Sequence, residues 1–290
     1  MIWANLSEVV MLSVFGDESH DSANKHVFVV AGLLGNSDTW AEVRAKWKKR
    51  LPDGLIFHAA DCESGHGDFK DMPESERLQL HLDLTQIVAN SKLMGYGHAI
   101  DLAGCHRVAP HLLKKFPDMP HYDCFVKTVG YLSDLARVFV PRDRVEFTFD
   151  QHKQTQYNAG LLYDWLAHYK DDVVEQVSFG TRREPGIQAA DIWARELMKR
   201  CDTHLFNQQA KPRLQWNTLL STRRFPFKLV LGGQFRKDLD AAAETYQGSD
   251  ELHEEYERWR LQHKLVDNLS NRFRWFAMKD TAKTVGESIK

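Results

Sequence analysis

The sequence predicts an α/β fold in which helices flank a mixed sheet. Short apolar and β-branched runs alternate along the chain with segments whose apolar residues recur every three or four positions. Several of the apolar runs end at an aspartate, a residue that is costly to bury without a partner. Because sites in open α/β sheets gather beyond strand ends, these aspartates are the first candidates for a functional role.

Composition is that of an ordinary globular protein, with 290 residues, 43% hydrophobic and 27% charged, and a formal net charge of −2. No overall basic field attracts nucleic acid, so such a ligand would need a local basic patch or bound metal. The four cysteines show no C-x-x-C spacing, which favours reduced thiols and a cytoplasmic protein. No apolar run approaches the roughly 20 residues of a membrane span, and acidic Glu8 stands where a signal peptide carries positive charge.

The predicted strands are short runs rich in valine, isoleucine, leucine and phenylalanine. They cover residues 9–15, 27–34, 93–100, 145–150 and 173–179. In the fourth run Val145, Phe147 and Phe149 alternate with polar residues, which indicates one buried face. A further short apolar segment, residues 55–61, also ends in polar groups.

The predicted helices carry apolar residues at three- and four-residue spacing, and several have a recognisable start. Asn36-Ser37-Asp38 offers a cap for the first, and Pro185 stands at the first position of the helix that ends near Arg200. The full set covers residues 39–50, 73–90, 106–115, 122–138, 158–169, 186–200 and 238–265. Residues 207–235 show no period, so we expect a core domain over 1–205 and a mainly helical extension over 206–290.

Asp17 and Glu18 follow the first apolar run directly. Successive side chains on a strand face opposite ways, so only one of the two can continue the inward row. We expect Asp17 to lie over the sheet as a metal ligand, with Glu18 close by where the strand ends. The alternative is a strand followed by an aspartate-rich turn without a site.

The helix predicted over 186–200 carries polar residues on one face. Gln188, Asp191 and Arg195 stand at i, i+3 and i+7, and alanines at 189, 190 and 194 would let this helix approach a sheet closely. An acid among alanines on a closely packed helix is a candidate ligand. The alternative is an intrahelical Asp191–Arg195 pair, worth only about 0.3–0.5 kcal/mol.

Taken together, Asp17, Glu18, Asp150 and Asp191 predict a cluster of carboxylates, with Asp101 a weaker candidate. Converging carboxylates repel unless cations neutralise them, and hard oxygen ligands favour Mg²⁺ or Mn²⁺. Two such ions about 3.5–4 Å apart activate a water and stabilise the leaving oxygen of a phosphodiester. The hypothesis is therefore a nuclease. A binding or assembly module without catalysis and a hydrolase of small phosphate compounds stay open as alternatives.

Four motifs carry a resemblance to a known family. They are F-G-D-E-S-H-D at 15–21, F-H-A-A-D at 57–61, F-T-F-D at 147–150 and Q-A-A-D-I-W-A at 188–194. In this order they resemble the domain-of-unknown-function 3800 family, whose fold is similar to ribonuclease H, over about residues 10–205. His20 departs from the glycine that is usual in the first motif. The resemblance implies a ribonuclease H-like sheet with Asp17, Glu18, Asp150 and Asp191 as its acidic site, and nuclease activity is what that fold implies.

Other residues are candidates for supporting roles. His58 is a candidate acid or base beside the carboxylates, although His58, Asp61, Cys62 and His66 could instead hold zinc. Gln188, Arg195, Arg182 and Arg183 are candidate substrate contacts, the last two to phosphate. Basic residues between 213 and 237 alternate with Trp216, Phe225 and Phe227, which would suit either a nucleic-acid groove or plain packing.

Overall fold

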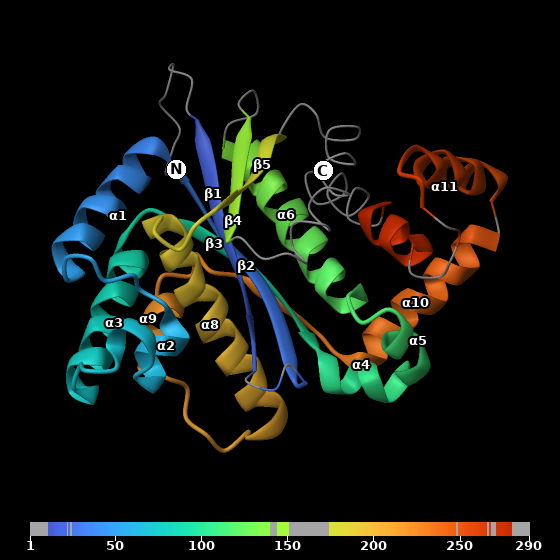
Figure 1. Ribbon diagram of the computed structural model, residues 1–290. Helices are drawn as coiled ribbons and strands as arrows, with labels where there is room; N and C mark the ends of the chain where they lie inside the picture. Colours follow the sequence, from blue (N-terminus) through green and yellow to red (C-terminus); the bar gives the residue numbers. More distant parts are fainter. Residues whose placement is uncertain are drawn as a thin grey trace.

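A computed structural model describes residues 11–21, 23, 25–139, 144–150, 174–247, 249–265, 267 and 271–279 of the chain. Its centre is a six-stranded mixed sheet with strand order β5-β4-β1-β2-β3-β6 (Figure 1). The strands are β1 (Leu12–His20), β2 (Val27–Asn36), β3 (Met94–Asp101), β4 (Val145–Asp150), β5 (Val174–Gly180) and β6 (Phe227–Val230). Only β2 runs antiparallel to its neighbours β1 and β3, and the other pairs are parallel.

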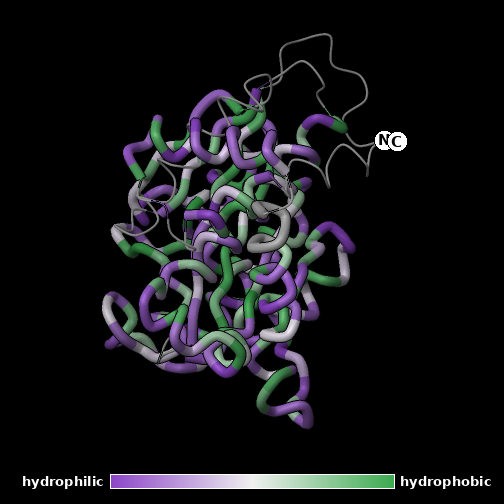
Figure 2. Tube along the Cα trace, turned by 90° about the vertical axis from the view of Figure 1, so that its right-hand side faces the viewer, coloured by the Kyte–Doolittle hydropathy of each residue, from purple (hydrophilic) through white to green (hydrophobic). Residues whose placement is uncertain are grey.

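Helices cover both faces of the sheet, so the described part of the chain has three layers (Figure 1). One face carries α1 (Ser37–Arg50), α2 (Ala59–Ser64), α3 (Glu74–Asn90), α8 (Pro185–Phe206) and α9 (Leu214–Leu220), with the short 3₁₀ helix η1 (Gly67–Phe69). The other carries α4 (Leu102–Val108), α5 (Pro110–Lys115), α6 (Met119–Phe139), α10 (Gly232–Gln247), α11 (Asp250–Gln262) and a helical segment over 271–279. Along the trace in Figure 2, outer helices pass repeatedly between hydrophilic and hydrophobic stretches, as expected for helices with one buried side.

The predicted α/β class is confirmed, and most predicted elements exist with small shifts at their ends. Two predicted helices are divided: 106–115 breaks at Ala109 between α4 and α5, and 238–265 breaks between α10 and α11. The helix predicted over 158–169 lies outside the described residues. Among the described helices, none has the length and apolar character that crossing a membrane requires.

The expectation that the first strand stops before Asp17 is wrong, because β1 continues to His20. Asp17 pairs with Ala31 of β2, and Glu18 pairs with Val30. The long apolar run of β2 offers a hydrogen-bonding partner for every residue of β1. Ladder pairing of this kind outweighs the weak strand propensity of two acidic residues.

The boundary proposed at residue 205 is also wrong for residues 206–230. β6 belongs to the same sheet and pairs in parallel with β3, and α9 packs against α3. Trp216 and Phe225 are buried, with ring centroids 5.8 and 5.4 Å from that of Trp193 in α8. These two aromatic residues therefore pack in the core and do not line a nucleic-acid groove.

Close approach of α8 to the sheet depends on small residues at its start. Ala189, Ala190 and Ala194 are fully buried, as their pattern predicted. A Cβ atom on Gly186 would lie 2.4 Å from the ring of Phe15, which β1 places on this face. The missing side chain thus lets the first turn of α8 rest directly on β1.

This contact yields a stability prediction. Gly186→Ala forces α8 or Phe15 to move, so we expect a loss of about 1–3 kcal/mol in the free energy of unfolding, measured by urea denaturation. Gly233→Ala is the matched control, because a Cβ there meets nothing within 4 Å and a helical alanine is at least as favourable as glycine. Equal stability of the two variants would contradict the close packing described here.

Candidate functional site

Asp17 and Asp150 lie side by side where the pairing between the parallel strands β1 and β4 ends. The register between β1 and β4 pairs Gly16 with Phe149, so Asp17 and Asp150 are the next residues on each strand. Phe15 belongs to the core on the α8 face and Phe149 to the core on the α6 face. Because side chains alternate, Asp17 and Asp150 both point to the α8 side.

Asp191 approaches the same place from α8. Its side chain is buried among the alanines of that helix, and its Oδ2 accepts a hydrogen bond of 2.6 Å from the backbone N–H of Ala59. Burial and the negative charges of Asp191 and Asp150 raise the pKa of Asp17 well above its ordinary value. The predicted convergence of Asp17, Asp150 and Asp191 is therefore present in the structure.

Among the residues that the structure describes, Asp17 and Asp191 form no ion pair. Arg182 donates from Nε to Asp150 Oδ2 at 3.0 Å, and its side chain is 53% exposed. Burial raises the pKa of Asp191 even though His58, the Ala59 N–H, Arg182 and Arg195 favour its charged form. Within the described part of the chain, the charges of Asp17 and Asp191 are thus not balanced by a paired cation. A buried set of carboxylate oxygens with a charge deficit fits a hard divalent cation such as Mg²⁺ or Mn²⁺.

Glu18 stands apart from the other three acids. Alternation along β1 turns its side chain toward the α6 face, where its strand partner Val30 belongs to the core. Its backbone N–H donates to Asp17 Oδ1 at 2.8 Å. Glu18 also lines a small hollow with Val30, Phe125 and the two aspartates of the strand ends. It borders the site from the opposite side of the sheet, and its role as a metal ligand stays a prediction.

His58 lies beside the aspartates, as the sequence suggested. Its Nδ1 lies 2.8 Å from Asp61 Oδ2, and it is the largest charged influence favouring ionised Asp191. The alternative zinc site does not form: the Cys62 thiol faces the carbonyl of Arg77 at 3.3 Å, and His66 Nδ1 lies 2.7 Å from the hydroxyl of Ser64. Asp101 is separate too, since it caps α4 by accepting from the N–H of Gly104.

Two of the residues predicted to contact substrate bind other residues of the protein instead. Gln188 is buried, accepts from Trp47 Nε1 at 2.8 Å and donates to the carbonyl of Arg182 at 2.7 Å. Arg195 donates to Glu63 Oε2 at 2.9 Å, rather than forming the surface pair with Asp191. The prediction that Gln188 and Arg195 bind substrate is not supported by these positions. Arg182 and Arg183 are exposed and remain candidates.

A second acidic group went unnoticed in the sequence. Ligand atoms of Glu63, His81 and Glu196 all lie within 4.8 Å of one another, the only such trio of His, Cys, Asp or Glu among the described residues. The three aspartates are thus spaced more widely than this trio. Here, however, Arg213 lies 2.7 Å from Glu63 Oε1 and 3.1 Å from Glu196 Oε1, and Arg195 holds the other oxygen of Glu63.

Two guanidinium groups therefore offset the two glutamates, so this trio does not call for a metal ion. It forms a buried charge network that joins α2, α3, α8 and the start of α9. No sequence spacing connects residues 63, 81, 196 and 213, which explains why the network was missed.

Comparison of the chain with protein-family models and with curated proteins gave no match. The candidate site accordingly stands on its geometry and charge. Asp17, Asp150 and Asp191 are its centre, His58 and Arg182 lie at its edge, and Glu18 lies behind the sheet.

The buried charge network predicts a specific pH dependence. Burial raises the pKa of Glu196 to about 7, so its contribution to stability is complete below its ordinary value of 4.5 and is lost as pH rises to 7. Burial lowers the pKa of His81 from 6.5 to about 4, so the contribution of His81 to stability grows as pH rises from about 4 to 6.5. In the native protein the two slopes oppose each other.

Glu196→Gln removes only the loss of stability that Glu196 causes as pH rises. Relative to the native protein, we expect the free energy of unfolding of the variant to increase by roughly 2–3 kcal/mol between pH 4.5 and 7.5. Urea denaturation across this range measures it, with exposed Glu76→Gln as control. A difference that does not change with pH would contradict the raised pKa that burial gives Glu196.

Proposed function

We propose that this protein is a metal-dependent phosphodiesterase that cleaves nucleic acid, built on a ribonuclease H-like sheet. The observation that carries the proposal is the gathering of Asp17, Asp150 and Asp191 from β1, β4 and α8, where buried Asp17 and Asp191 form no ion pair with any described residue. A mixed sheet with helices on both faces and acids at its central strands supports the ribonuclease H-like assignment.

The three aspartates would hold Mg²⁺ or Mn²⁺. Such ions, when bound as a pair, supply an activated water and stabilise the leaving oxygen of a phosphodiester. The wide spacing of the aspartates suits ligands that are shared between two ions better than a single tight shell. Because Asp17 and Asp191 are buried on the sheet, they hold their positions without help from solvent.

Neighbouring residues would handle protons and substrate charge. The contact of His58 Nδ1 with Asp61 orients the ring, so Nε2 is the atom that would exchange a proton with a leaving group or an attacking water. Arg182 joins the Asp150 carboxylate while remaining about half exposed, so the same guanidinium could also meet a phosphate oxygen.

Metal binding is the first test. We expect millimolar Mn²⁺ or Mg²⁺ to raise the melting temperature of the native protein, because an ion that binds only the folded state stabilises it by RT ln(1 + [L]/Kd). Asp17→Asn should abolish this shift. Absence of any shift in the native protein, together with no cleavage of mixed oligonucleotides, would favour a binding or assembly module instead.

The second test is loss of activity with retention of the fold. Asp17→Asn and Asp191→Asn should each lower the rate of oligonucleotide cleavage by on the order of 10²-fold or more, since even residues that only orient metal ligands cost 10–100-fold. Both variants should keep or gain stability at neutral pH, because each removes a buried charge and relieves the repulsion between Asp17 and Asp191. Asp71→Asn, at an exposed carboxylate, is the control. Unfolding of the two variants would point to a structural role for the acids.

A further inference from the structure

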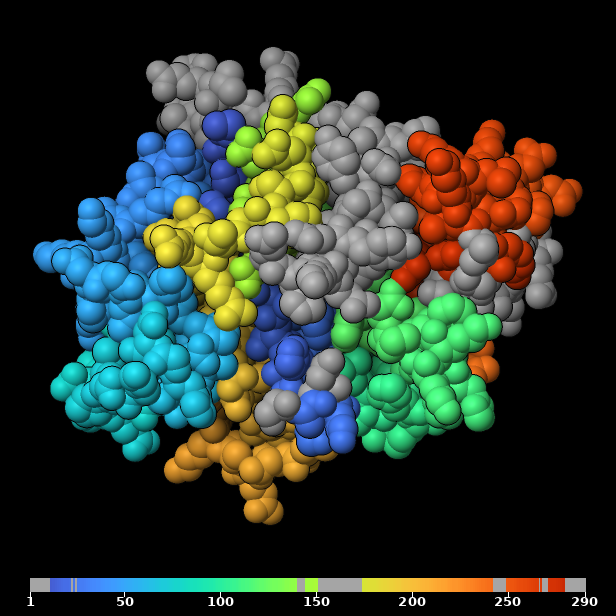
Figure 3. Space-filling model, in the orientation of Figure 1, coloured from blue at the N-terminus to red at the C-terminus, as the bar shows by residue number. Residues whose placement is uncertain are grey.

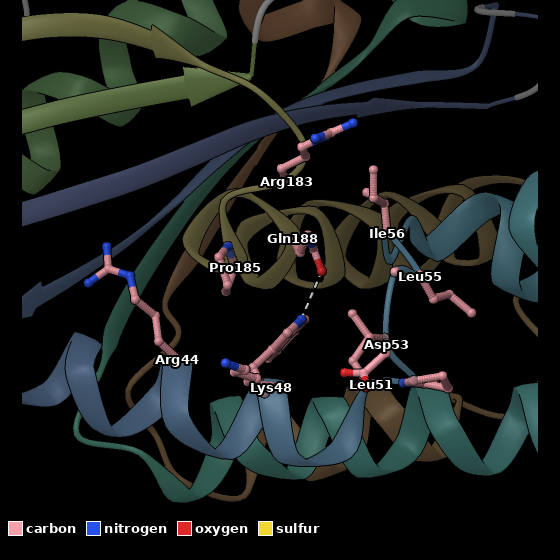
Figure 4. A pocket seen from close by; sticks show the side chains of 12 residues that line it. Arg44, Lys48, Leu51, Asp53, Leu55, Ile56, Arg183, Pro185 and Gln188 are labelled. Carbon is pink, nitrogen blue, oxygen red and sulfur yellow. Dashed lines mark hydrogen bonds between the residues drawn. The ribbon is translucent and has the colours of Figure 1, made fainter.

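A recess of about 570 Å³ lies next to the aspartate site. Figure 4 shows that it is framed by α1, by the first turn of α8 and by the segment that follows α1. On the face drawn in Figure 3, the end of β5 and the turn after it (yellow) lie against this part of the molecule. Its volume is within the range of about 300–1,000 Å³ that is typical of small-ligand pockets.

In each of three separate chain segments, one residue lines the recess and a residue close to it in the sequence belongs to the aspartate site or contacts it. Arg183 lines the recess, and Arg182 pairs with Asp150. Gln188 lines it, one helical turn before Asp191. Ile56 lines it, three residues before Ala59, whose N–H binds Asp191. These sequence neighbours place the recess next to the aspartate site.

The lining combines positive charge with apolar walls. Arg44, Lys48 and Arg183 supply three cations against the single carboxylate of Asp53. Arg44 also donates to Glu184 at 2.9 Å, whereas Lys48 and Arg183 are exposed. Apolar surface comes from Leu51, Pro52, Leu55, Ile56 and Pro185. This combination suits a ligand with a phosphate at one end and a flat, weakly polar group at the other.

The wall between the recess and the site is rigid. Gln188 forms it, with hydrogen bonds to Trp47 Nε1, to the N–H of Phe57 and to the carbonyl of Arg182. The first of these is the dashed line in Figure 4. One side chain thereby fixes α1, the 55–58 segment and the turn that carries both arginines, so the distance between the two sites is set by the fold.

We propose that the recess receives one unstacked nucleotide of a single-stranded nucleic acid, next to the phosphate that the aspartates would cleave. The inference rests on the proposed function and adds that the substrate is single-stranded. A base that is paired and stacked in a duplex cannot enter a recess in the protein without first leaving the helix, so a single strand enters at lower cost. Lys48 and Arg183 would contact phosphates on either side of the bound nucleotide.

Binding is measured apart from cleavage, by fluorescence anisotropy of labelled oligonucleotides in the presence of Ca²⁺. We expect a single strand to bind at least 10-fold more tightly than a duplex of the same sequence. Lys48→Glu and Arg183→Glu should each weaken single-strand binding by 5-fold or more and make it less dependent on salt. Lys49→Glu is the matched control, because this exposed neighbour on α1 does not line the recess.

Ile56→Trp provides a second test that leaves the charges unchanged. A larger side chain should fill the recess and weaken single-strand binding, and in cleavage assays it should raise KM more than it lowers kcat. DNA and RNA strands are both used as probes, together with a mononucleotide as competitor. Competition by the mononucleotide as strong as that by the oligonucleotide would overturn the proposal in favour of a small phosphate compound.

The outcomes separate this inference from the proposed function. Equal binding of single strand and duplex, or no effect of Lys48→Glu and Ile56→Trp in a protein that cleaves oligonucleotides, would overturn the recess inference and leave the nuclease proposal standing. Tight single-strand binding that depends on Lys48 and Arg183, without cleavage in Mn²⁺, would support the recess and overturn the nuclease proposal.

Discussion

Electrostatic repulsion among Asp17, Asp150 and Asp191 is the constraint around which this face of the protein is arranged. Three carboxylates are held at the junction of β1, β4 and α8, and two of them are buried. Burial alone disfavours their charged forms, and their mutual repulsion adds to that cost. The fold nevertheless brings them together, with a glycine and alanines that let α8 lie close to the sheet. The described contacts that favour their charged forms include Arg182 with Asp150, the N–H of Ala59 with Asp191 and the N–H of Glu18 with Asp17.

A second pair of buried carboxylates in the same molecule differs from the aspartates in how its charge is balanced. Glu63 and Glu196 are also buried close together, but Arg195 and Arg213 contact their oxygens and balance their charge. Such a network has little need of an external ion and joins four helices into one unit. Asp191, which contacts the first residue of α2, and Asp17 form no ion pair with an arginine among the described residues. This contrast is the reason why we propose a structural role for the glutamates and a catalytic one for the aspartates.

Gln188 connects the site to its surroundings in a way that its position in the sequence did not suggest. Its buried amide bonds to α1, to the segment before α2 and to the turn before α8. These are the elements that carry the cations of the neighbouring recess, His58 and Arg182. A buried polar group with satisfied hydrogen bonds rigidifies what it joins. Gln188 thus positions both parts of the proposed substrate-binding surface, while its own amide is bonded within the protein.

Local pattern in the sequence determined the α/β class and most of the strands and helices, and it marked Asp17, Asp150 and Asp191 as candidate site residues. Those features follow from side-chain alternation, helical spacing and the small residues of α8, all of which act over a few neighbouring positions. Tertiary structure alone decided that β1 continues through its acids, that β6 joins the sheet, that Glu18 turns to the other face and that Arg195 pairs with Glu63. Each of these depends on contacts between segments far apart in the chain, whose pairing is fixed by the free energy of the whole fold and leaves no periodic trace in the sequence.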